Sequence, residues 1–358
     1  MLPGGPDAPG AADLRAGAHW ALESAAPRGT LWPVPLAIRV HAYGKADQLR
    51  CDCIESPVPG PGEVLVRTTA IGVNFIDVYH RTGFYPLPDL PHGIGIEAAG
   101  VVEALGSGVG GHAIGDRVAW AGGRPGAYAE QVVVPADRLL PIPAGIDDEQ
   151  AAAVLLKGLT AEFLLRRAFP VKAGMKVLVH AAAGGVGSLL CQWAREIGAT
   201  VLGTVSTEKK AEQAEADGCT HAIVYTREDF ATTVRHLTQG EGVDVVYDGV
   251  GKDTLARSLD CLRPRGMLVS FGNASGPPGP LDPLDLSRKG SLFLTRPSLS
   301  DYTRTRAGLL AAAEQVFGML RRGALRPRIH ERVPLLEARA AHEMLEARES
   351  LGSILLIP

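Results

Sequence analysis

The chain has 358 residues, 46% of them hydrophobic, and a formal net charge of −3. This length allows two domains of ordinary size, and the hydrophobic fraction is large enough for each to bury a core. No basic block stands out and no apolar run reaches the length of a membrane span, so we expect neither a nucleic-acid nor a membrane partner. The five cysteines are odd in number and lack framework spacing, which is typical of a reducing compartment such as the cytoplasm.

Residues 1–36 differ in composition from the rest of the chain. They are rich in Pro, Gly and Ala, lack hydrophobic periodicity and contain no apolar core of a secretory signal. Asp7, Asp13 and Glu23 argue against a transit peptide. We therefore predict a loosely ordered N-terminal extension, with a short helix near residues 13–24 as an option.

The next region, from Ala37 to about Ala153, has the texture of a β-rich domain. Short alternating segments such as Glu63–Ala70 and Gly100–Leu105 are separated by Pro and Gly turns. Alternation with a period of two, broken at turns, is typical of an all-β fold.

The run His180–Gly187 is the most informative stretch of the chain. It lies between the apolar, strand-like segment Lys176–Val179 and the helix-like segment Ser188–Ile197. A strand, a glycine turn and a helix in this order form a cradle for pyrophosphate, because the glycines let backbone N–H groups approach the phosphates. The spacing is Ala181-x-x-Gly184-x-x-Gly187 and not the usual G-x-G-x-x-G, so a tight turn without a ligand is the alternative. We predict a dinucleotide site.

The residues after the next strand indicate which dinucleotide is bound. An NAD site would place an acid here to hold the ribose 2′-OH, but this chain has Thr204 and Ser206, followed by Lys209 and Lys210. Hydroxyl and ammonium groups attract a 2′-phosphate, which favours NADPH. Glu208 is either a displaced ribose ligand or an acid that complements the dipole of the following helix.

Strand-like and helix-like segments continue to alternate after this point. The predicted strands are 200–205, 222–225, 243–248, 266–271 and 291–295, and the predicted helices are 208–216, 229–237 and 254–262. Such alternation predicts a doubly wound parallel sheet with its ligand at the carboxyl ends of the strands. The tail has an amphipathic helix over Leu336–Ala347 and a strand over Ser353–Ile357. We expect the tail to rejoin the β-rich region, so that the cofactor domain is an insertion and a cleft between the domains holds the nicotinamide.

Several motifs together resemble a known superfamily. Pro59–Val66, Gly115–Val118 and the glycine run are similar to the medium-chain dehydrogenase/reductase superfamily. Within it, the chain resembles the zeta-crystallin-type NADPH:quinone oxidoreductases through four motifs: Asn74–Asp77, Lys157–Thr160, Ala183–Gly187 and Phe271–Asn273. The likeness extends from about Ala37 to Pro358.

The resemblance implies an α/β fold with a GroES-like β-rich catalytic domain and an inserted doubly wound Rossmann domain. The expected limits are 37–156 and 297–358 for the catalytic domain and 157–296 for the NADPH-binding domain. The implied activity is hydride transfer from NADPH to a small-molecule quinone. Family members pair through the last strand of the cofactor domain, so Leu292–Leu294 is expected at the interface of a homodimer.

The same resemblance bears on metal binding. Zinc-dependent members of the superfamily use Cys, His and carboxylate ligands. The segment Asn74–Asp77 has no cysteine, Ile96 stands where a ligand histidine would be, and the structural cysteine cluster is missing. Cys51 and Cys53 form the only close pair, with no third ligand nearby. We therefore expect a site without metal.

The resemblance also implies the site residues. Asn74, Tyr79 and Tyr85 would form the catalytic cleft, with Asn74 bonding the cofactor amide or ribose and the tyrosines contacting a flat acceptor. The expected cofactor-binding residues are Asn74, Tyr79, Thr160, Gly184, Gly185, Val186, Thr204, Ser206, Lys210, Tyr225, Phe271, Asn273 and Arg348. Two other functions stay open: an NADPH-dependent enoyl or alkenal double-bond reductase, and a non-catalytic NADPH-binding protein of the crystallin kind.

Overall fold

A computed structural model describes residues 34–348 and 350–358. The predicted N-terminal extension, with its optional helix near residues 13–24, lies outside the described residues apart from its last three. The first strand, β1, already begins at Leu36. In the part of the chain that the structure describes, no helix is both long enough and apolar enough to cross a membrane.

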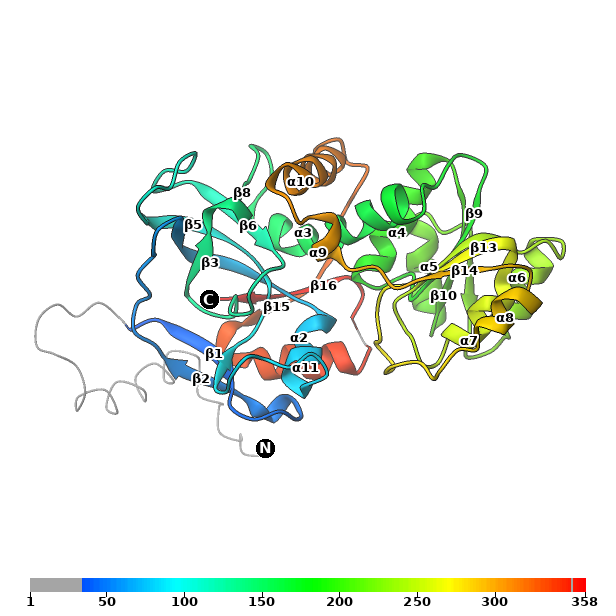
Figure 1. The fold of residues 1–358 in the computed structure, drawn as a ribbon, viewed down its shortest axis with the longest axis horizontal. Helices are drawn as coiled ribbons and strands as arrows, with labels where there is room; N and C mark the ends of the chain where they lie inside the picture. Colours follow the sequence, from blue (N-terminus) through cyan, green and yellow to red (C-terminus); the bar gives the residue numbers. More distant parts are fainter. Residues whose placement is uncertain (1–33, 349) are drawn as a thin grey trace, which may run out of the picture. The chain divides into compact units, whose positions relative to one another are not determined.

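The β-rich region forms two sheets (Figure 1). A three-stranded sheet has the order β2-β1-β4, with β1 over Leu36–Val40, β2 over Leu49–Cys53 and β4 over His92–Gly93. A seven-stranded sheet has the order β15-β16-β3-β5-β6-β8, and β7 also pairs with β3. Its strands are β3 (Glu63–Val73), β5 (Glu97–Leu105), β6 (Arg117–Ala121), β7 (Gln131–Pro135), β8 (Leu140–Pro141), β15 (Ile329–Pro334) and β16 (Ser353–Ile357).

The C-terminal tail completes the larger sheet, as predicted. Strand β16 runs antiparallel to β3, with Leu355 opposite Gly72, and it also pairs with β15. Before β16 the chain forms helix α11 (Ala338–Glu346). The region between the two halves of this sheet in sequence is therefore an insertion.

The inserted region forms a six-stranded sheet whose paired strands are all parallel. The strand order is β11-β10-β9-β12-β13-β14. The strands are β9 (Lys176–His180), β10 (Thr200–Val205), β11 (His221–Val224), β12 (Val243–Asp248), β13 (Leu262–Ser270) and β14 (Phe293–Thr295). The connecting helices include α4 (Gly185–Ile197), α5 (Glu208–Ala216), α6 (Phe230–Leu237) and α7 (Leu255–Ser258).

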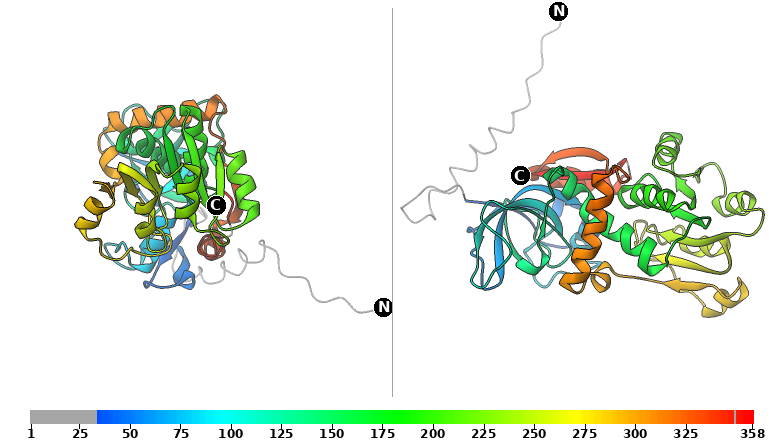
Figure 2. Two further views of the ribbon diagram at one scale, coloured as in Figure 1. Left: turned by 90° about the vertical axis from the view of Figure 1, so that its right-hand side faces the viewer. Right: turned by 90° about the horizontal axis from the view of Figure 1, so that it is seen from above.

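Burial on both faces explains why these strands are almost entirely apolar. In β9, Val177 and Val179 belong to a core that contains Trp193 of α4, whereas Leu178 belongs to a second core that contains Phe230 of α6. Alternate residues of a strand point to opposite faces, so helices must cover both sides of the sheet (Figure 2). This arrangement confirms the predicted doubly wound fold.

Helix α3 (Asp148–Phe163) joins the two sheets. It packs against β3, β5 and β6 on one side and against α4 on the other, and α10 (Arg306–Arg321) packs along it (Figure 1). The expected domain boundary between residues 156 and 157 falls inside this helix. The domain limits stay predictions.

One helix interrupts the region that we predicted to be all-β. Helix α2 spans Phe75–Thr82, starts after Asn74 and ends at Gly83, whose φ of 79° only glycine adopts readily. The buried residues of this helix are Asp77, Val78 and Arg81. A helix of two turns is too short to be stable by itself, so tertiary contacts decide its conformation.

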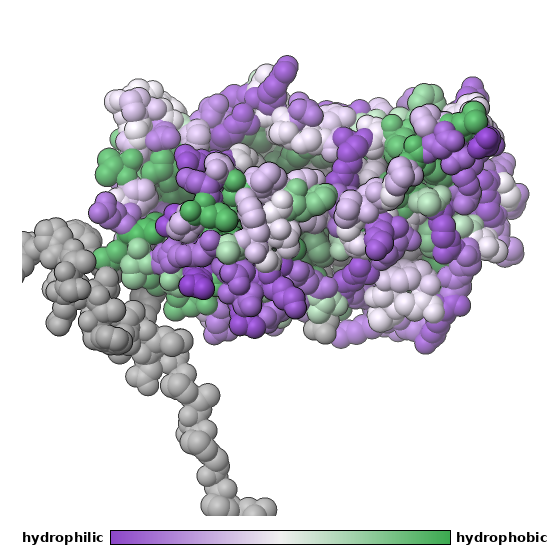
Figure 3. Space-filling model, turned by 60° about the horizontal axis from the view of Figure 1, so that its bottom comes forward, coloured by the Kyte–Doolittle hydropathy of each residue, from purple (hydrophilic) through white to green (hydrophobic). Residues whose placement is uncertain are grey.

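On the face shown in Figure 3, hydrophilic residues predominate and hydrophobic ones gather in small patches. Most large apolar side chains of the described region are packed in the cores, and those that are exposed lie in loops, on β14, on α8 (Pro283–Arg288), on α10 or on the short helix η5 (Leu335–Glu337).

Candidate active site

A pocket opens at the carboxyl ends of the central parallel strands, where the strand order reverses. Ala181, Thr204, Tyr225 and Val250 line it from the ends of β9, β10, β11 and β12. The opposite wall includes Phe75 of α2, and Leu345 and Arg348 from the end of α11 and beyond. The predicted site residues that line this pocket are Gly184, Thr204, Ser206, Lys210, Tyr225 and Arg348. Open parallel sheets bind ligands at this position.

The glycine loop forms a tight cradle at the start of α4. A Cβ atom on Gly187 would lie 2.1 Å from the carbonyl oxygen of Ala181, and a Cβ atom on Gly185 would lie 2.9 Å from Cδ of Lys157. Gly184 is the N-cap of α4 and forms an isolated parallel bridge with Gly352 of the catalytic region. The backbone amides of Gly185 and Val186 belong to the first turn of α4 and lie at a helix N-terminus, where anions bind.

The outer end of the pocket is cationic and rich in hydroxyl groups. Lys210 lies in the first turn of α5 and Ser206 directly follows β10. The Lys210 ammonium donates a hydrogen bond to the carbonyl oxygen of Arg348. The Arg348 guanidinium lies 3.7 Å from the carboxylate of Asp253. Lys210 therefore links the cofactor region to the segment that follows α11.

The surroundings of Glu208 favour the second of its two interpretations. This residue is in the first turn of α5, more than half exposed, and forms an ion pair with Arg227. It is not among the residues that line the pocket, whereas Lys210, two residues later, is. An acid in the first turn complements the helix dipole. Lys209, next to Glu208 in the chain, is exposed.

Sequence reasoning missed three side chains around this end. Arg257 lines the pocket and stacks over the ring of Phe230, with its guanidinium carbon 4.6 Å from the ring centroid. His180 is buried behind Thr204, and its Nδ1 lies 2.8 Å from the Thr204 hydroxyl. Burial lowers the pKa of His180, so the ring is neutral. These residues come from separate elements, and no local spacing relates them.

The inner end of the site is aromatic. Tyr79 packs edge-on against Tyr85 at 5.3 Å and against Phe84 at 5.5 Å between ring centroids. The Tyr79 hydroxyl accepts a hydrogen bond of 2.8 Å from the backbone N–H of Asn273, so the two predicted residues meet across the two sheets. Burial raises the pKa of Tyr79 to about 12, although the Asn273 amide and Arg296 oppose this shift. The phenol therefore keeps its proton at neutral pH.

Arg296 is a further residue that the sequence did not reveal. It follows β14, and its Nη2 donates to the Tyr85 hydroxyl at 3.4 Å. Its Nη1 donates to the carbonyl oxygen of Gly272 at 3.0 Å. Because these partners are neutral, the guanidinium supplies positive charge beside the two tyrosines.

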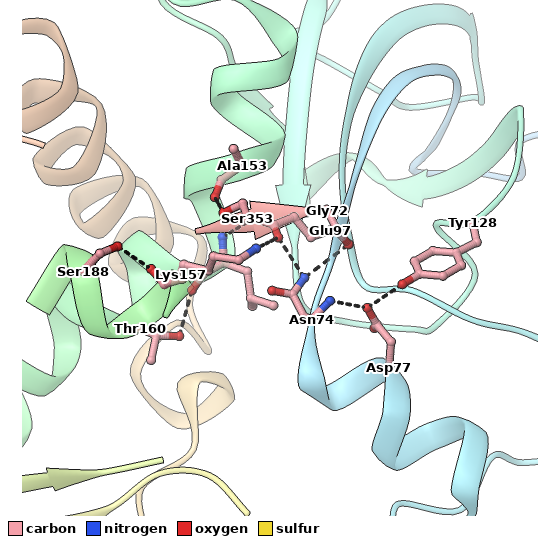
Figure 4. A network of polar contacts seen from close by, with 12 residues as sticks. Gly72, Asn74, Asp77, Glu97, Tyr128, Ala153, Lys157, Thr160, Ser188 and Ser353 are labelled. Atoms are coloured by element: carbon pink, nitrogen blue, oxygen red, sulfur yellow. Dashed lines mark hydrogen bonds and ion pairs between the residues drawn. The ribbon is translucent and has the colours of Figure 1, made fainter. Parts of the chain in front are cut away.

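Asn74 lies in a network of polar contacts, between Asp77 on one side and Glu97 and Lys157 on the other (Figure 4). Its amide Nδ2 donates to Oε2 of Glu97 at 2.8 Å and to the carbonyl oxygen of Gly72 at 3.2 Å. The same Glu97 oxygen accepts from Nζ of Lys157 at 3.1 Å. Thr160, one turn after Lys157, donates its hydroxyl hydrogen to the Leu156 carbonyl at 2.7 Å.

The remaining predicted residues border the site without lining the pocket. Phe271 follows β13, and a Cβ atom on Gly249 would lie 2.9 Å from its ring. Asn273 is placed by Tyr79 as described. Asn74, Tyr79, Tyr85, Thr160, Gly185 and Val186 belong to the same region but not to the lining.

Among residues 34–348 and 350–358, no group of three or more His, Cys, Asp or Glu side chains is placed to hold a metal ion.

Comparisons with known proteins agree with this geometry. The model for an alcohol dehydrogenase GroES-like domain matches residues 60–144, and the model for a zinc-binding dehydrogenase matches residues 185–312. A quinone oxidoreductase of Pseudomonas aeruginosa is 50% identical over 321 residues, which cover 90% of this chain and 99% of that protein. A 2-haloacrylate reductase of Burkholderia sp is 46% identical over 329 residues, with the same two coverages. The crystal structure of Escherichia coli quinone oxidoreductase complexed with NADPH is 45% identical, has a TM-score of 0.89, and is matched over 90% of this chain and 100% of that chain.

Proposed function

Because this chain belongs to the quinone oxidoreductase family of the medium-chain dehydrogenase/reductase superfamily, we propose that it transfers a hydride from NADPH to a quinone. One observation carries the proposal: a single pocket joins a glycine cradle at a helix N-terminus to an outer end that contains Ser206 and Lys210. The first feature suits a pyrophosphate and the second suits a 2′-phosphate.

The residues present fit NADPH. A Cβ atom at Gly185 or Gly187 would collide with the Lys157 side chain or the Ala181 carbonyl oxygen, so the tight turn into α4 requires glycine at both positions. Lys210, Arg257 and Arg348 all line the pocket, where Arg257 forms an ion pair with Asp229 and Arg348 lies 3.7 Å from Asp253. The ammonium group of Lys210 and the hydroxyl group of Ser206, both in the pocket lining, support a cofactor with an additional phosphate group.

NADPH, when bound, supplies the hydride, and the chain's own residues orient the reactants. Reduction of a quinone to a hydroquinone takes up one hydride and one proton, and the anionic product formed first is readily protonated. The rings of Tyr79 and Tyr85 offer an aromatic wall to a flat acceptor. The protonated Tyr79 hydroxyl donates a hydrogen bond to the acceptor oxygen, and Arg296 stabilises the negative charge that develops there. Holding the nicotinamide and the acceptor close together in the correct orientation is the main catalytic effect.

A second candidate is the reduction of an activated carbon–carbon double bond. The 2-haloacrylate reductase relative favours this candidate. Such a reaction needs a proton at the carbon next to the carbonyl group, and Tyr79 is the protonated group at the inner end of the site.

One steady-state experiment separates the two candidates. The protein is mixed with NADPH and either a small para-quinone or an α,β-unsaturated ketone, and the loss of the reduced nicotinamide absorbance is followed. Rapid loss with the quinone alone supports the proposal, and rapid loss with the enone alone replaces it by the second candidate. Binding of NADPH without turnover of either acceptor would refute both enzymatic functions.

We also propose that the chain forms a homodimer through β14, in the cytoplasm. Strand β14 ends the six-stranded order, and Phe293 and Leu294 on it are 55% and 38% exposed. An apolar edge strand of this kind favours pairing with a second copy. Phe293→Lys should lower the mass measured by light scattering to that of one chain, whereas Ile114→Lys, at a 70% exposed loop position before β6, should not. A wild-type monomer would refute the dimer.

All five cysteines are free thiols, which supports a reducing compartment.

A further inference from the structure

The amide of Asn74 is held from behind by a buried ion pair that the proposed function does not use. Glu97 is fully buried, and Lys157 is 6% exposed. The Glu97 carboxylate accepts from the backbone N–H of Leu156 at 2.6 Å, from Nζ of Lys157 at 3.1 Å and from Nδ2 of Asn74 at 2.8 Å. We propose that Glu97 and Lys157 are positioning residues, which fix the Asn74 amide so that its oxygen faces the nicotinamide carboxamide. This inference rests on the proposed use of NADPH.

The backbone around Glu97 is shaped to admit its carboxylate. A Cβ atom on Gly72 would lie only 2.2 Å from Oε2 of Glu97 and 2.6 Å from the carbonyl oxygen of Ala152. The carboxylate thus occupies space that any side chain at position 72 would fill. Strand β3 brings Gly72 and Asn74 next to each other in sequence, and β5 begins at Glu97.

The hydrogen bonds determine which way the Asn74 amide points. Both hydrogens on Nδ2 are donated inward, one to Glu97 and one to the Gly72 carbonyl. If the amide were rotated by half a turn, its oxygen would meet the Glu97 carboxylate and the Gly72 carbonyl, which are both acceptors. The charge on Glu97 therefore excludes the rotated form. At the start of α2, the Asp77 N–H donates to the backbone carbonyl oxygen of Asn74, and the Asn74 N–H donates to Oδ2 of Asp77.

Figure 4 shows where the amide oxygen points. It is directed away from Glu97, to the side on which Lys157 and Thr160 lie. An amide oxygen can only accept hydrogen bonds, so the group it recognises must be a donor. The carboxamide N–H groups of nicotinamide are such donors, whereas the phosphates and the adenine 2′-phosphate are acceptors at neutral pH.

Lys157 connects this arrangement to the glycine cradle. Its ammonium compensates the Glu97 charge, which would be costly to bury alone. Its Cδ and Cε atoms lie against Gly185, at 2.9 and 3.0 Å from the position of a Cβ atom there. The same side chain therefore contacts the pyrophosphate cradle and fixes the carboxylate that orients Asn74. One ion pair would thus fix both the residue that binds the nicotinamide carboxamide and the loop that binds the pyrophosphate.

Binding measurements without any acceptor test the inference. Glu97→Gln keeps the shape of the side chain but replaces one of its two acceptor oxygens by an NH2 group, so it can no longer accept from Leu156, Lys157 and Asn74 together and the hold on the Asn74 amide is weakened. We expect this variant to bind NADPH about tenfold more weakly, the loss of roughly one hydrogen bond. Adenosine 2′,5′-bisphosphate, which has the 2′-phosphate but no nicotinamide, should bind within about twofold of the wild type. The matched control is Glu103→Gln on the same strand, where the carboxylate pairs with Arg67 at the surface.

A double-variant cycle makes the test specific to Asn74. Asn74→Ala should weaken NADPH by a similar factor, and adding Glu97→Gln to it should cause little further loss, because the two residues act through one contact. If Glu97→Gln does not fold, Glu97→Asp gives a second test, since it keeps the charge opposite Lys157 but shortens the reach to Asn74, and it should again weaken NADPH and spare the bisphosphate. Equal weakening of both ligands, unchanged NADPH binding, or additive losses in the double variant would overturn the inference. Failure of the proposed function is a separate result, namely a wild-type protein that binds NADPH without reducing quinones.

Discussion

Replacing Lys210 with alanine should weaken NADPH binding and leave NADH binding nearly unchanged. A hydrogen bond between an ammonium group and a phosphate contributes about 1.5 to 3 kcal/mol. The outer end of the pocket is open, since Tyr225 is 41% exposed and the Arg348 side chain is 46% exposed. Solvent and salt therefore screen the charge, and we expect the lower part of that range, about 1.5 to 2 kcal/mol. This is roughly a 10- to 30-fold increase in the Kd for NADPH.

The assay compares both cofactors in two variants of neighbouring lysines. Kd and KM are measured for NADPH and NADH in Lys210→Ala and in Lys209→Ala, whose side chain is exposed and outside the pocket lining. Lys210 also bonds the Arg348 carbonyl, and any loosening of that segment would weaken NADPH and NADH alike. The informative quantity is therefore the increase in Kd for NADPH divided by the increase in Kd for NADH. This ratio should become smaller as salt is added. Equal losses for NADPH and NADH, or the same ratio in Lys209→Ala, would refute the assignment.

Three further outcomes are expected. Tyr79→Phe should lower kcat about tenfold and leave the KM for NADPH almost unchanged, because in the proposed function the hydroxyl donates to the acceptor oxygen; a shift confined to the NADPH KM would contradict this role. A chelator such as 1,10-phenanthroline should leave quinone reduction unaffected, because Ile96 stands where a zinc-dependent relative has its histidine; activity that is lost and then restored by zinc would show otherwise. Burial raises the pKa of Asp77 to about 7, so native Asp77 holds a proton that the unfolded chain has lost between roughly pH 4 and 7. This contribution to the free energy of unfolding is complete below pH 4 and disappears as pH rises through 7. Relative to the wild type, the free energy of unfolding of Asp77→Asn should therefore rise by up to about 4 kcal/mol between pH 4 and 7, as measured by denaturant titrations. A difference that does not change with pH would rule out the raised pKa.

Local patterns predicted the cofactor half of the fold well. The bounds expected for the strand 200–205 and the helix 208–216 are those of β10 and α5. Strands that are buried on both faces appear in the sequence as unbroken apolar runs. The start of α5 is indicated by Thr207, a residue type that favours the N-cap position. The placement of Lys210 in the pocket followed from position alone, because a strand end and the next helix start always lie at this edge of the sheet.

The contacts that sequence reasoning missed join residues far apart in the chain. Arg296 meets Tyr85 across 211 positions, and Glu97 meets Lys157 across 60. The sequence does not show whether a charged residue is buried or exposed. Only its neighbours in the folded protein decide this. Helix α2 was missed for a related reason: two turns are stabilised by Asp77, which accepts from the Asn74 N–H and from Tyr128, and not by their own periodicity.

The two ends of the site should therefore respond differently to substitution. The outer end discriminates between cofactors with groups that solvent reaches, namely the half-buried Lys210 and the exposed Arg348. The inner end depends on the buried series Tyr128, Asp77, Asn74, Glu97 and Lys157, in which removal of one partner leaves another polar group without compensation (Figure 4). Cofactor preference can thus change at the outer end with little effect on the free energy of unfolding, whereas changes at the inner end couple nicotinamide binding to stability. Thermal unfolding of Lys210→Ala and Glu97→Gln, measured with and without NADPH, checks this contrast: the first variant should melt like the wild type in the absence of cofactor, and the second should melt lower.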